Sequence, residues 1–324
     1  MPLSMPTTDG LPAAAPPPAR RGRRGVVGLR ALGVLAVVAV IAVGWTSLRS
    51  ALGGVTAGES CAATVDGTTT SLDPEQAGNA ATITAVAVAR GLPARAATIG
   101  LATALQESKL RNLDHGDRDS LGLFQQRPSA GWGTPAQVRD PVYAANAFYD
   151  VLVKIEGYKT APITQAAQKV QRSGYPGAYA QREEEARVLA STLSGYSPGG
   201  FTCNLKPVTG AVVQQPGAGG YTPRAAAVVA AAKREAGHAP APGPADSTGT
   251  TVRYVLTGTQ ARRLGWGLAH WSVARAAALD VVAVRTDGLQ WRREAPGRGW
   301  TAPAGSAAPV PAGTVEIVVA EGDK

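Results

Sequence analysis

The chain has 324 residues, of which 44% are hydrophobic, so it is long enough for two modest domains with packed cores. Lys and Arg total 32 against 23 Asp and Glu, a net charge of +9, but four arginines of this excess lie together within residues 20–24. The remainder is therefore less basic than the total suggests, and since it holds no nucleic-acid-binding motif, we expect no nucleic-acid partner.

Residues 1–24 are rich in Pro, Ala and Arg without apolar periodicity, which predicts a disordered cytoplasmic tail. Residues 25–48 contain an uncharged, mostly apolar run between Arg30 and Arg49, long enough to span a bilayer as a single transmembrane anchor. The arginines before this run place the amino terminus in the cytoplasm and the bulk of the protein outside the cell membrane. The alternative is a cleaved secretory signal, which would also export the protein.

Residues 49–72 contain several glycines and a run of threonines, and we expect them to form a flexible linker. The chain has two cysteines, Cys61 and Cys203, which frame the region that follows. In an oxidising compartment such a pair predicts a disulfide, and two free buried thiols are the alternative.

Residues 73–203 have helical signals and almost no strand-like alternation, which predicts a mainly α domain. Asp73-Pro74 and Asp140-Pro141 each combine an N-cap with proline at the first helical position. The expected helices are 74–90, 93–109, 141–154, 163–172 and 176–193, with irregular structure from 111 to 139.

After Cys203 the composition changes, and we expect a linker at 204–221 and a small α+β domain at 222–324. Strands are predicted at 251–257, 281–285, 289–293 and 314–320, around a helix from about Thr259 to Leu279.

Glu107 is the candidate catalytic residue. Cleavage of a glycosidic bond needs a carboxylic acid that delivers a proton to the departing oxygen, and partial burial keeps such a group protonated. The preceding helix, ARAATIGLATALQ, has one charge, Arg95, far from Glu107. A solvated surface glutamate is the simpler alternative.

The loop after Glu107 supplies polar candidates for contacts with a substrate. Gly122 allows close backbone approach to a ligand, while Gln125 and Gln126 can bond sugar substituents. Trp132 is suited to stacking on a sugar ring or to packing. Asp117 and Asp119 are possible second carboxylates, or turn-forming residues of a solvated loop.

Glu107-Ser108 followed by Gly122-Leu123-Phe124-Gln125 resembles the Glu-Ser and Gly-Leu-Met-Gln signature of lytic transglycosylases and goose-type lysozymes. The resemblance implies a lysozyme-like fold for 73–203, peptidoglycan glycan strands as substrate, and Glu107 as the single acid/base supported by Ser108. Tyr175, in QRSGYPGAY, occupies the region where the family often has Ala-Tyr-Asn-Ala-Gly. That motif is not matched here, so a substrate contact by Tyr175 or Tyr179 rests on position alone.

By this resemblance the expected reaction breaks the β-1,4 bond between N-acetylmuramoyl and N-acetylglucosaminyl units without water, leaving a 1,6-anhydro end. A muramidase route would instead need a second carboxylate to position water. The alternative to both is a non-catalytic cell-wall-binding or scaffold protein that retains the fold.

The carboxy-terminal region, 222–320, loosely resembles zinc D-alanyl-D-alanine peptidases of the LAS type. Those enzymes hold zinc with a histidine-aspartate pair and a later histidine. The chain has only His115, His238 and His270, and TVEIVVA replaces the strand that should carry a histidine. We therefore expect a metal-free, non-catalytic domain at 222–324, no cofactor, and a packing role for His270.

Overall fold

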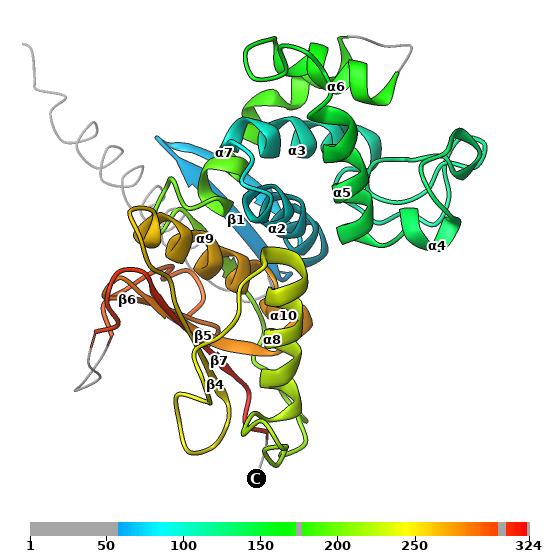
Figure 1. Cartoon of the computed structure of the whole chain (residues 1–324). Coiled ribbons are helices and arrows are strands. Elements are labelled where there is room, and N and C mark those ends of the chain that lie inside the picture. The colour runs from blue at the N-terminus through cyan, green and yellow to red at the C-terminus, as the bar shows by residue number, and fades with distance from the viewer. Residues whose placement is uncertain (1–57, 173–176, 304–308, 323–324) are drawn as a thin grey trace, which may run out of the picture. The chain divides into compact units, whose positions relative to one another are not determined.

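The computed structural model describes residues 58–172, 177–303 and 309–322. This part of the chain is mixed α/β, with helices and two antiparallel sheets (Figure 1). Within the described ranges, no helix is both long and apolar enough to cross a bilayer. The predicted tail at 1–24, the predicted transmembrane segment at 25–48 and Tyr175 lie outside the described residues. The mixture of helices and sheets confirms the coarse fold class, while the lysozyme-like fold stays a prediction.

The first sheet begins in a segment that we expected to be linker. Strands β1 (Ser60–Val65) and β2 (Thr68–Leu72) form a hairpin, and β3 (Phe201–Asn204) pairs with the other edge of β1. The turn at Asp66-Gly67 places both residues in the left-handed region, a geometry that suits a two-residue hairpin. The linker prediction is thus wrong for 60–72: β1 buries Cys61 and Ala63 in alternate positions, and the threonine run continues into β2, which buries Thr70 and Leu72 in the same way.

The disulfide joins β1 to β3, the strands at the beginning and the end of residues 60–204, which we call the first half. Cys61 lies directly opposite Cys203 in the β1–β3 ladder, and their sulfurs are bonded. The predicted disulfide is therefore confirmed, and the bridge encloses a loop with a sequence separation of 142.

Four of the predicted helices between the cysteines are present with small shifts at their ends, and the fifth, predicted from residue 176, begins only at Glu183. They are α2 (Pro74–Ala89), α3 (Ala94–Ser108), α5 (Pro141–Leu152), α6 (Ile163–Gln171) and α7 (Glu183–Leu193). Asp73 caps α2 by accepting from the Gln76 amide, and Asp140 caps α5, as their positions before proline predicted. The irregular region contains short helices η1 (Pro128–Ala130) and α4 (Pro135–Val138), and η2 (Ala178–Arg182) precedes α7.

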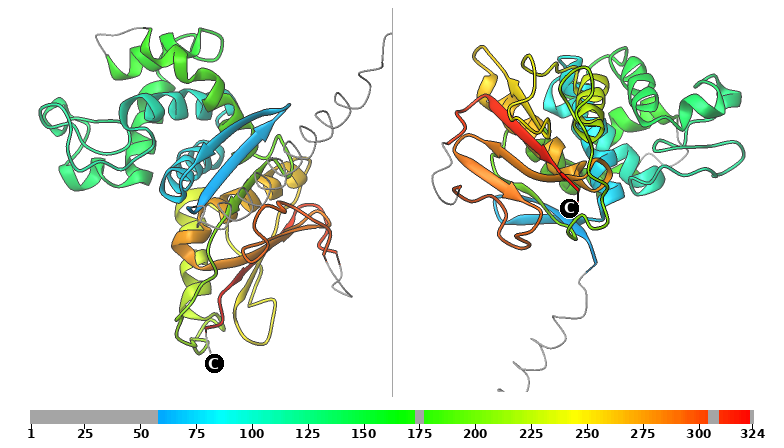
Figure 2. Two further views of the ribbon diagram at one scale, coloured as in Figure 1. Left: turned by 180° about the vertical axis from the view of Figure 1, so that it is seen from behind. Right: turned by 90° about the horizontal axis from the view of Figure 1, so that it is seen from below.

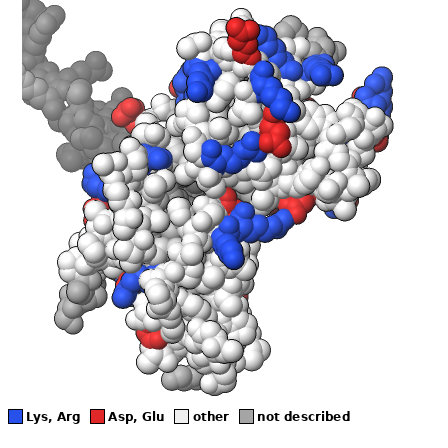
Figure 3. Space-filling model, in the orientation of Figure 1, with Lys and Arg blue, Asp and Glu red and all other residues white. Residues whose placement is uncertain are grey.

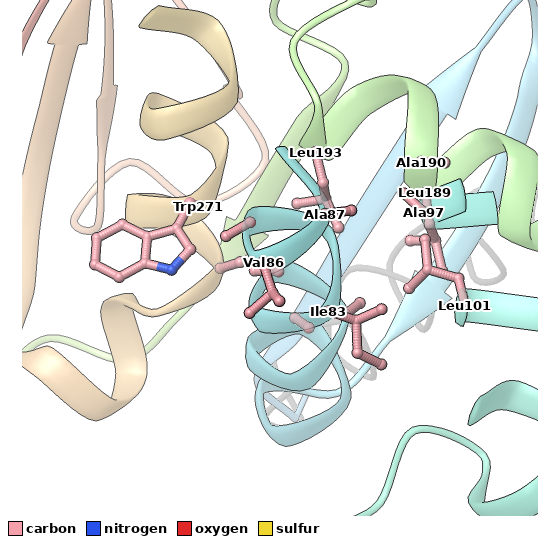
Figure 4. Packing of buried hydrophobic residues seen from close by; sticks show 14 of the residues in the cluster. Ile83, Val86, Ala87, Ala97, Leu101, Leu189, Ala190, Leu193 and Trp271 are labelled. Carbon is pink, nitrogen blue, oxygen red and sulfur yellow. The ribbon is translucent and has the colours of Figure 1, made fainter. Parts of the chain in front are cut away.

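Helix α2 is the centre of the core. Every residue from Ala77 to Val86 is buried, and most have small side chains. Figure 4 shows Trp271 packed against one side of α2, while Leu101 and Leu189 approach from the opposite side. Because small side chains allow close approach on every face, helices from both halves of the unit pack directly on α2.

The carboxy-terminal half contains the predicted strands as a second sheet of order β4-β7-β5-β6. The strands are β4 (Thr251–Val255), β5 (Val281–Thr286), β6 (Leu289–Arg292) and β7 (Thr314–Val319). The expected single helix is broken at Arg275 into α9 (Ala261–Ala274) and α10 (Ala276–Leu279), and α8 (Pro223–Ala236) precedes β4. Helix α9 lies between this sheet and the helices of the first half (Figure 2).

Buried polar contacts join the two halves. The Glu235 carboxylate of α8 accepts from Thr82 of α2 and from the indole of Trp271, both at 2.8 Å, and pairs with Arg275 at 3.2 Å. His270 of α9 is fully buried, and its Nδ1 lies 2.7 Å from the carbonyl oxygen of Thr192 at the end of α7. Residues 59–324 accordingly form one compact unit, and a domain boundary at 204–221 stays a prediction.

Loss of the disulfide should lower the free energy of unfolding. Replacing Cys61 and Cys203 together by Ser frees a long loop in the denatured chain, which corresponds to a loss of up to about 5 kcal/mol by loop-closure entropy. Urea denaturation of both proteins measures the loss, and dithiothreitol should destabilise the wild type while leaving the variant unchanged. Equal midpoints for the two oxidised proteins would contradict the stabilising role.

Burial lowers the pKa of His270 from 6.5 to about 4. Between these values the unfolded chain binds a proton that the folded chain does not, so stability is full above pH 6.5 and falls towards pH 4. His270→Asn keeps a donor for the Thr192 carbonyl and removes the titration. The loss of unfolding free energy between about pH 7.5 and about pH 5 should shrink by about 2 kcal/mol in this variant. The exposed His115→Asn should retain the wild-type dependence, and identical pH profiles for wild type and His270→Asn would refute the assignment.

Candidate functional site

Glu107 lies in the last turn of α3, at the point where the chain leaves the helix. Lys109 and Leu110 both have left-handed backbone conformations, which end the helix and turn the chain into the following loop. Ala104, Leu105 and Ser108 face the core, whereas Glu107 is half-buried. The helix end therefore holds the Glu107 carboxylate at the edge of the core with access to solvent.

Two donors fix one oxygen of that carboxylate. The hydroxyl of Tyr179, on η2, donates to Oε1 at 2.7 Å, and Nε2 of Gln171, the last residue of α6, lies 3.2 Å from the same oxygen. Tyr179 is buried, so its ring position is set by packing. Among the described residues Oε2 has no hydrogen-bond partner, and this oxygen is the one free to meet a ligand.

The turn at residues 121–126 is bound to the end of α3. A bridge between Leu121 and Gln126 closes the turn. The hydroxyl of Ser108 donates to the Leu123 carbonyl at 2.8 Å, and Nε2 of Gln171 donates to the Phe124 carbonyl at 2.7 Å. Since the amide of Gln171, which is distant in the sequence, reaches both Glu107 and this turn, Glu107 and the turn form one site.

Close packing holds two residues of the turn in place. At Gly122, with φ of +75°, a Cβ atom would lie 2.2 Å from the Val138 carbonyl oxygen, so close packing of the turn on α4 requires this glycine. The Gln126 side chain is buried and donates to the Ala144 carbonyl at 3.2 Å, so it anchors α5 instead of facing a ligand. We therefore correct the predicted substrate contact of Gln126 to a packing role, whereas backbone contact between Gly122 and a substrate stays a prediction.

A groove of about 380 Å³ lies beside this turn. Gln125 and Trp132 both line it, and their contact with a substrate stays a prediction. The side chain of Gln171, which also lines the groove, donates to Glu107. Trp132 is half-buried: part of its side chain packs against the core, and the rest is exposed to solvent. The remaining lining residues are Arg127, Ala130, Gly131, Val151, Val170 and Arg172.

The two candidate second carboxylates have different environments. Asp119 accepts from the backbone amide and the hydroxyl of Ser129, at 2.7 and 2.9 Å, and pairs with Arg127 at 2.9 Å. The Ser129 amide, followed by the Arg127 guanidinium, holds the pKa of Asp119 far below its ordinary value. Both oxygens are thus engaged within the loop, whereas Asp117 is exposed.

Tyr179 and Gln171 are side chains of the candidate site for which the sequence alone provided no specific reason to assign a role. For Tyr179, only its position in the chain, in the region where the family often has Ala-Tyr-Asn-Ala-Gly, suggested a contact with the substrate. Gln171 occupies the end of an amphipathic helix, where a polar residue is ordinary, so no local signal marked it. Their shared role depends on α6 and η2 both packing against α3.

No family model matches the chain, and no curated protein matches it with significant similarity. Within the described ranges, no group of three or more His, Cys, Asp or Glu side chains is arranged to hold a metal ion.

Ser108→Ala should destabilise the site more than an exposed serine does. The variant leaves the buried Leu123 carbonyl without its donor, which corresponds to a loss of about 1 to 2 kcal/mol in the free energy of unfolding. Urea denaturation measures the change, with exposed Ser71→Ala as the control, expected to stay within about 0.5 kcal/mol of wild type. If both variants match the wild type, the hydrogen bond from Ser108 does not stabilise the turn.

Proposed function

We propose that the protein is a lytic transglycosylase with a lysozyme-like fold, which cleaves the β-1,4 bond between N-acetylmuramoyl and N-acetylglucosaminyl units of peptidoglycan. The observation that carries the proposal is the amide of Gln171, which donates to Glu107 and to the Phe124 carbonyl of the Gly-Leu-Phe-Gln turn. It links an acid to a groove lined by Gln125 and Trp132. A scaffold protein would need neither feature.

The proposed reaction uses one carboxyl group twice. Glu107, protonated on Oε2, gives its proton to the glycosidic oxygen as the bond from that oxygen to C1 of the muramoyl unit breaks. The resulting carboxylate then accepts the proton of the muramoyl 6-hydroxyl while O6 forms a bond to C1. The anhydro product forms without water, and Glu107 regains its proton. Tyr179 and Gln171 keep Oε1 engaged, which leaves Oε2 to carry the transferred proton.

The engagement of Asp119 favours this route over hydrolysis. A muramidase that inverts configuration needs a second carboxylate free to activate water. Asp119 has its oxygens bound by Ser129 and Arg127, and loss of these contacts would release the loop. The single acid/base therefore accounts for the described side chains more simply than a pair of carboxylates does.

The proposed location is the outer face of the cell membrane, with the amino-terminal segment as anchor or cleaved signal. The disulfide supports this placement, because such bonds persist in oxidising compartments. On the face drawn in Figure 3, basic side chains are interspersed with acidic ones, a pattern that favours a glycan partner over a nucleic acid.

Digestion of purified peptidoglycan strands by the full-length protein tests the proposal. Wild type should release fragments with 1,6-anhydro ends, which are lighter by one water than hydrolysis products, as read by mass spectrometry. Glu107→Gln keeps the side-chain shape but cannot transfer the proton, so its rate should fall by about a thousandfold or more. Glu156→Gln, an exposed glutamate outside the site, is the matched control and should retain full activity.

The products separate the alternatives. Fragments that carry an added water would replace the transglycosylase by a muramidase. If neither wild type nor Glu107→Gln releases fragments, the scaffold alternative holds. Equal activity of wild type and Glu107→Gln would remove Glu107 from the reaction.

A further inference from the structure

A second groove, of about 510 Å³, lies away from Glu107 and shares no lining residue with the groove beside Trp132. Its walls come from the β1–β2 turn, the first turns of α3, and helix α7 with the segment that follows it. None of these lining residues takes part in the proposed reaction.

An exposed aromatic ring borders this groove. Tyr196 has 58% of its surface exposed, and among the exposed large hydrophobic side chains of the described residues it is the aromatic one. Single exposed aliphatic residues are normal on a protein surface, but an exposed aromatic ring beside a groove is a typical contact for a flat ligand face.

The Tyr196 ring is held in place. The guanidinium of Arg263 stacks over it at 4.8 Å, and Arg263 is itself fixed by hydrogen bonds to the Ser194 carbonyl and to Gln260. The backbone there is also constrained, because a Cβ at Gly195 would lie 1.9 Å from the Arg263 carbonyl oxygen. Little conformational entropy is thus lost when a ligand packs on the ring.

The polar lining has balanced charge. Asp66 and Glu184 contribute two carboxylates, while Arg95 and Arg187 contribute two guanidinium groups. Arg95 donates inward to the carbonyls of Tyr158 and Ala161, and Arg187 pairs with Glu183. Both guanidinium groups thus already have partners within the protein, and neither is reserved for an anionic ligand. The hydroxyls of Thr68 and Ser191 add groups that both donate and accept.

We propose that this groove is a second, non-catalytic saccharide site, which binds a strand of uncharged N-acetylated sugars. A sugar ring has one apolar face suited to stacking on Tyr196 and hydroxyls that match a lining of mixed donors and acceptors. The balance of charge disfavours a strongly acidic ligand. That the strand belongs to the wall polymer rests on the proposed function, whereas the class of ligand rests on the groove itself.

Binding of the full-length protein to chitin beads, an insoluble polymer of N-acetylglucosamine, tests the inference without requiring cleavage. In a Glu107→Gln background, which prevents turnover, Tyr196→Ala should raise the apparent Kd by about fivefold through loss of the stacking contact. Tyr196→Trp should preserve binding. Val255→Ala alters another exposed hydrophobic residue, on β4 outside the groove, and should bind as the parent does.

The outcomes distinguish this site from the catalytic proposal. Parent and Tyr196→Ala binding equally, equal losses for Tyr196→Ala and Val255→Ala, or no binding by the parent would each overturn the inference. Tyr196-dependent binding by a protein that releases no peptidoglycan fragments would support the inference while refuting the transglycosylase. Cleavage of peptidoglycan without Tyr196-dependent binding to chitin would support the transglycosylase and refute the second saccharide site.

Discussion

The burial of α2 on all its faces is the constraint on which the rest of the structure depends. A helix can accept neighbours on every side only if most of its side chains are small and its polar groups find hydrogen-bond partners inside the protein. Thr84 bonds the Ala80 carbonyl, Thr82 shares Glu235 with Trp271, and Asn79 donates to the Leu110 carbonyl. Helix α2 thus joins the first half to the carboxy-terminal half and also reaches the chain just beyond Glu107.

That central helix sets the position of the candidate site. Helix α3 packs on α2 closely enough that a Cβ at Gly100 would lie 3.2 Å from the Ile83 side chain. That Cβ would also lie 2.7 Å from the hydroxyl of Tyr149 on α5, which donates to the Ile83 carbonyl of α2. With α3 fixed, Glu107 emerges at its end, and α6 and η2 deliver the side chains of Gln171 and Tyr179. The packing contacts between α2 and α3 therefore stabilise the fold and also hold Glu107 in position.

Much of the secondary structure could be predicted because its signals are local. Asp73-Pro74 and Asp140-Pro141 encode helix starts through their own backbone geometry, and alternating apolar residues marked β4 and β7. The hairpin at 60–72 was missed because glycines and threonines are also typical of linkers, and the two segments become strands by pairing, β1 with β2 on one edge and with the distant β3 on the other. The break between α9 and α10 at Arg275 likewise followed from packing, since the residues on both sides favour a helix.

By itself, the sequence determined the helix starts, the strand pattern of the carboxy-terminal half and the candidacy of Glu107, and it predicted the disulfide that the structure shows. Only the tertiary structure decided which side chains meet Glu107: Gln171 and Tyr179 reach it from 64 and 72 residues away. It also decided that Asp119 is bound by Ser129 and Arg127, and that Gln126 is buried. The physical reason is that capping and periodicity are local properties of the chain, whereas hydrogen-bond partners and burial depend on how distant helices pack.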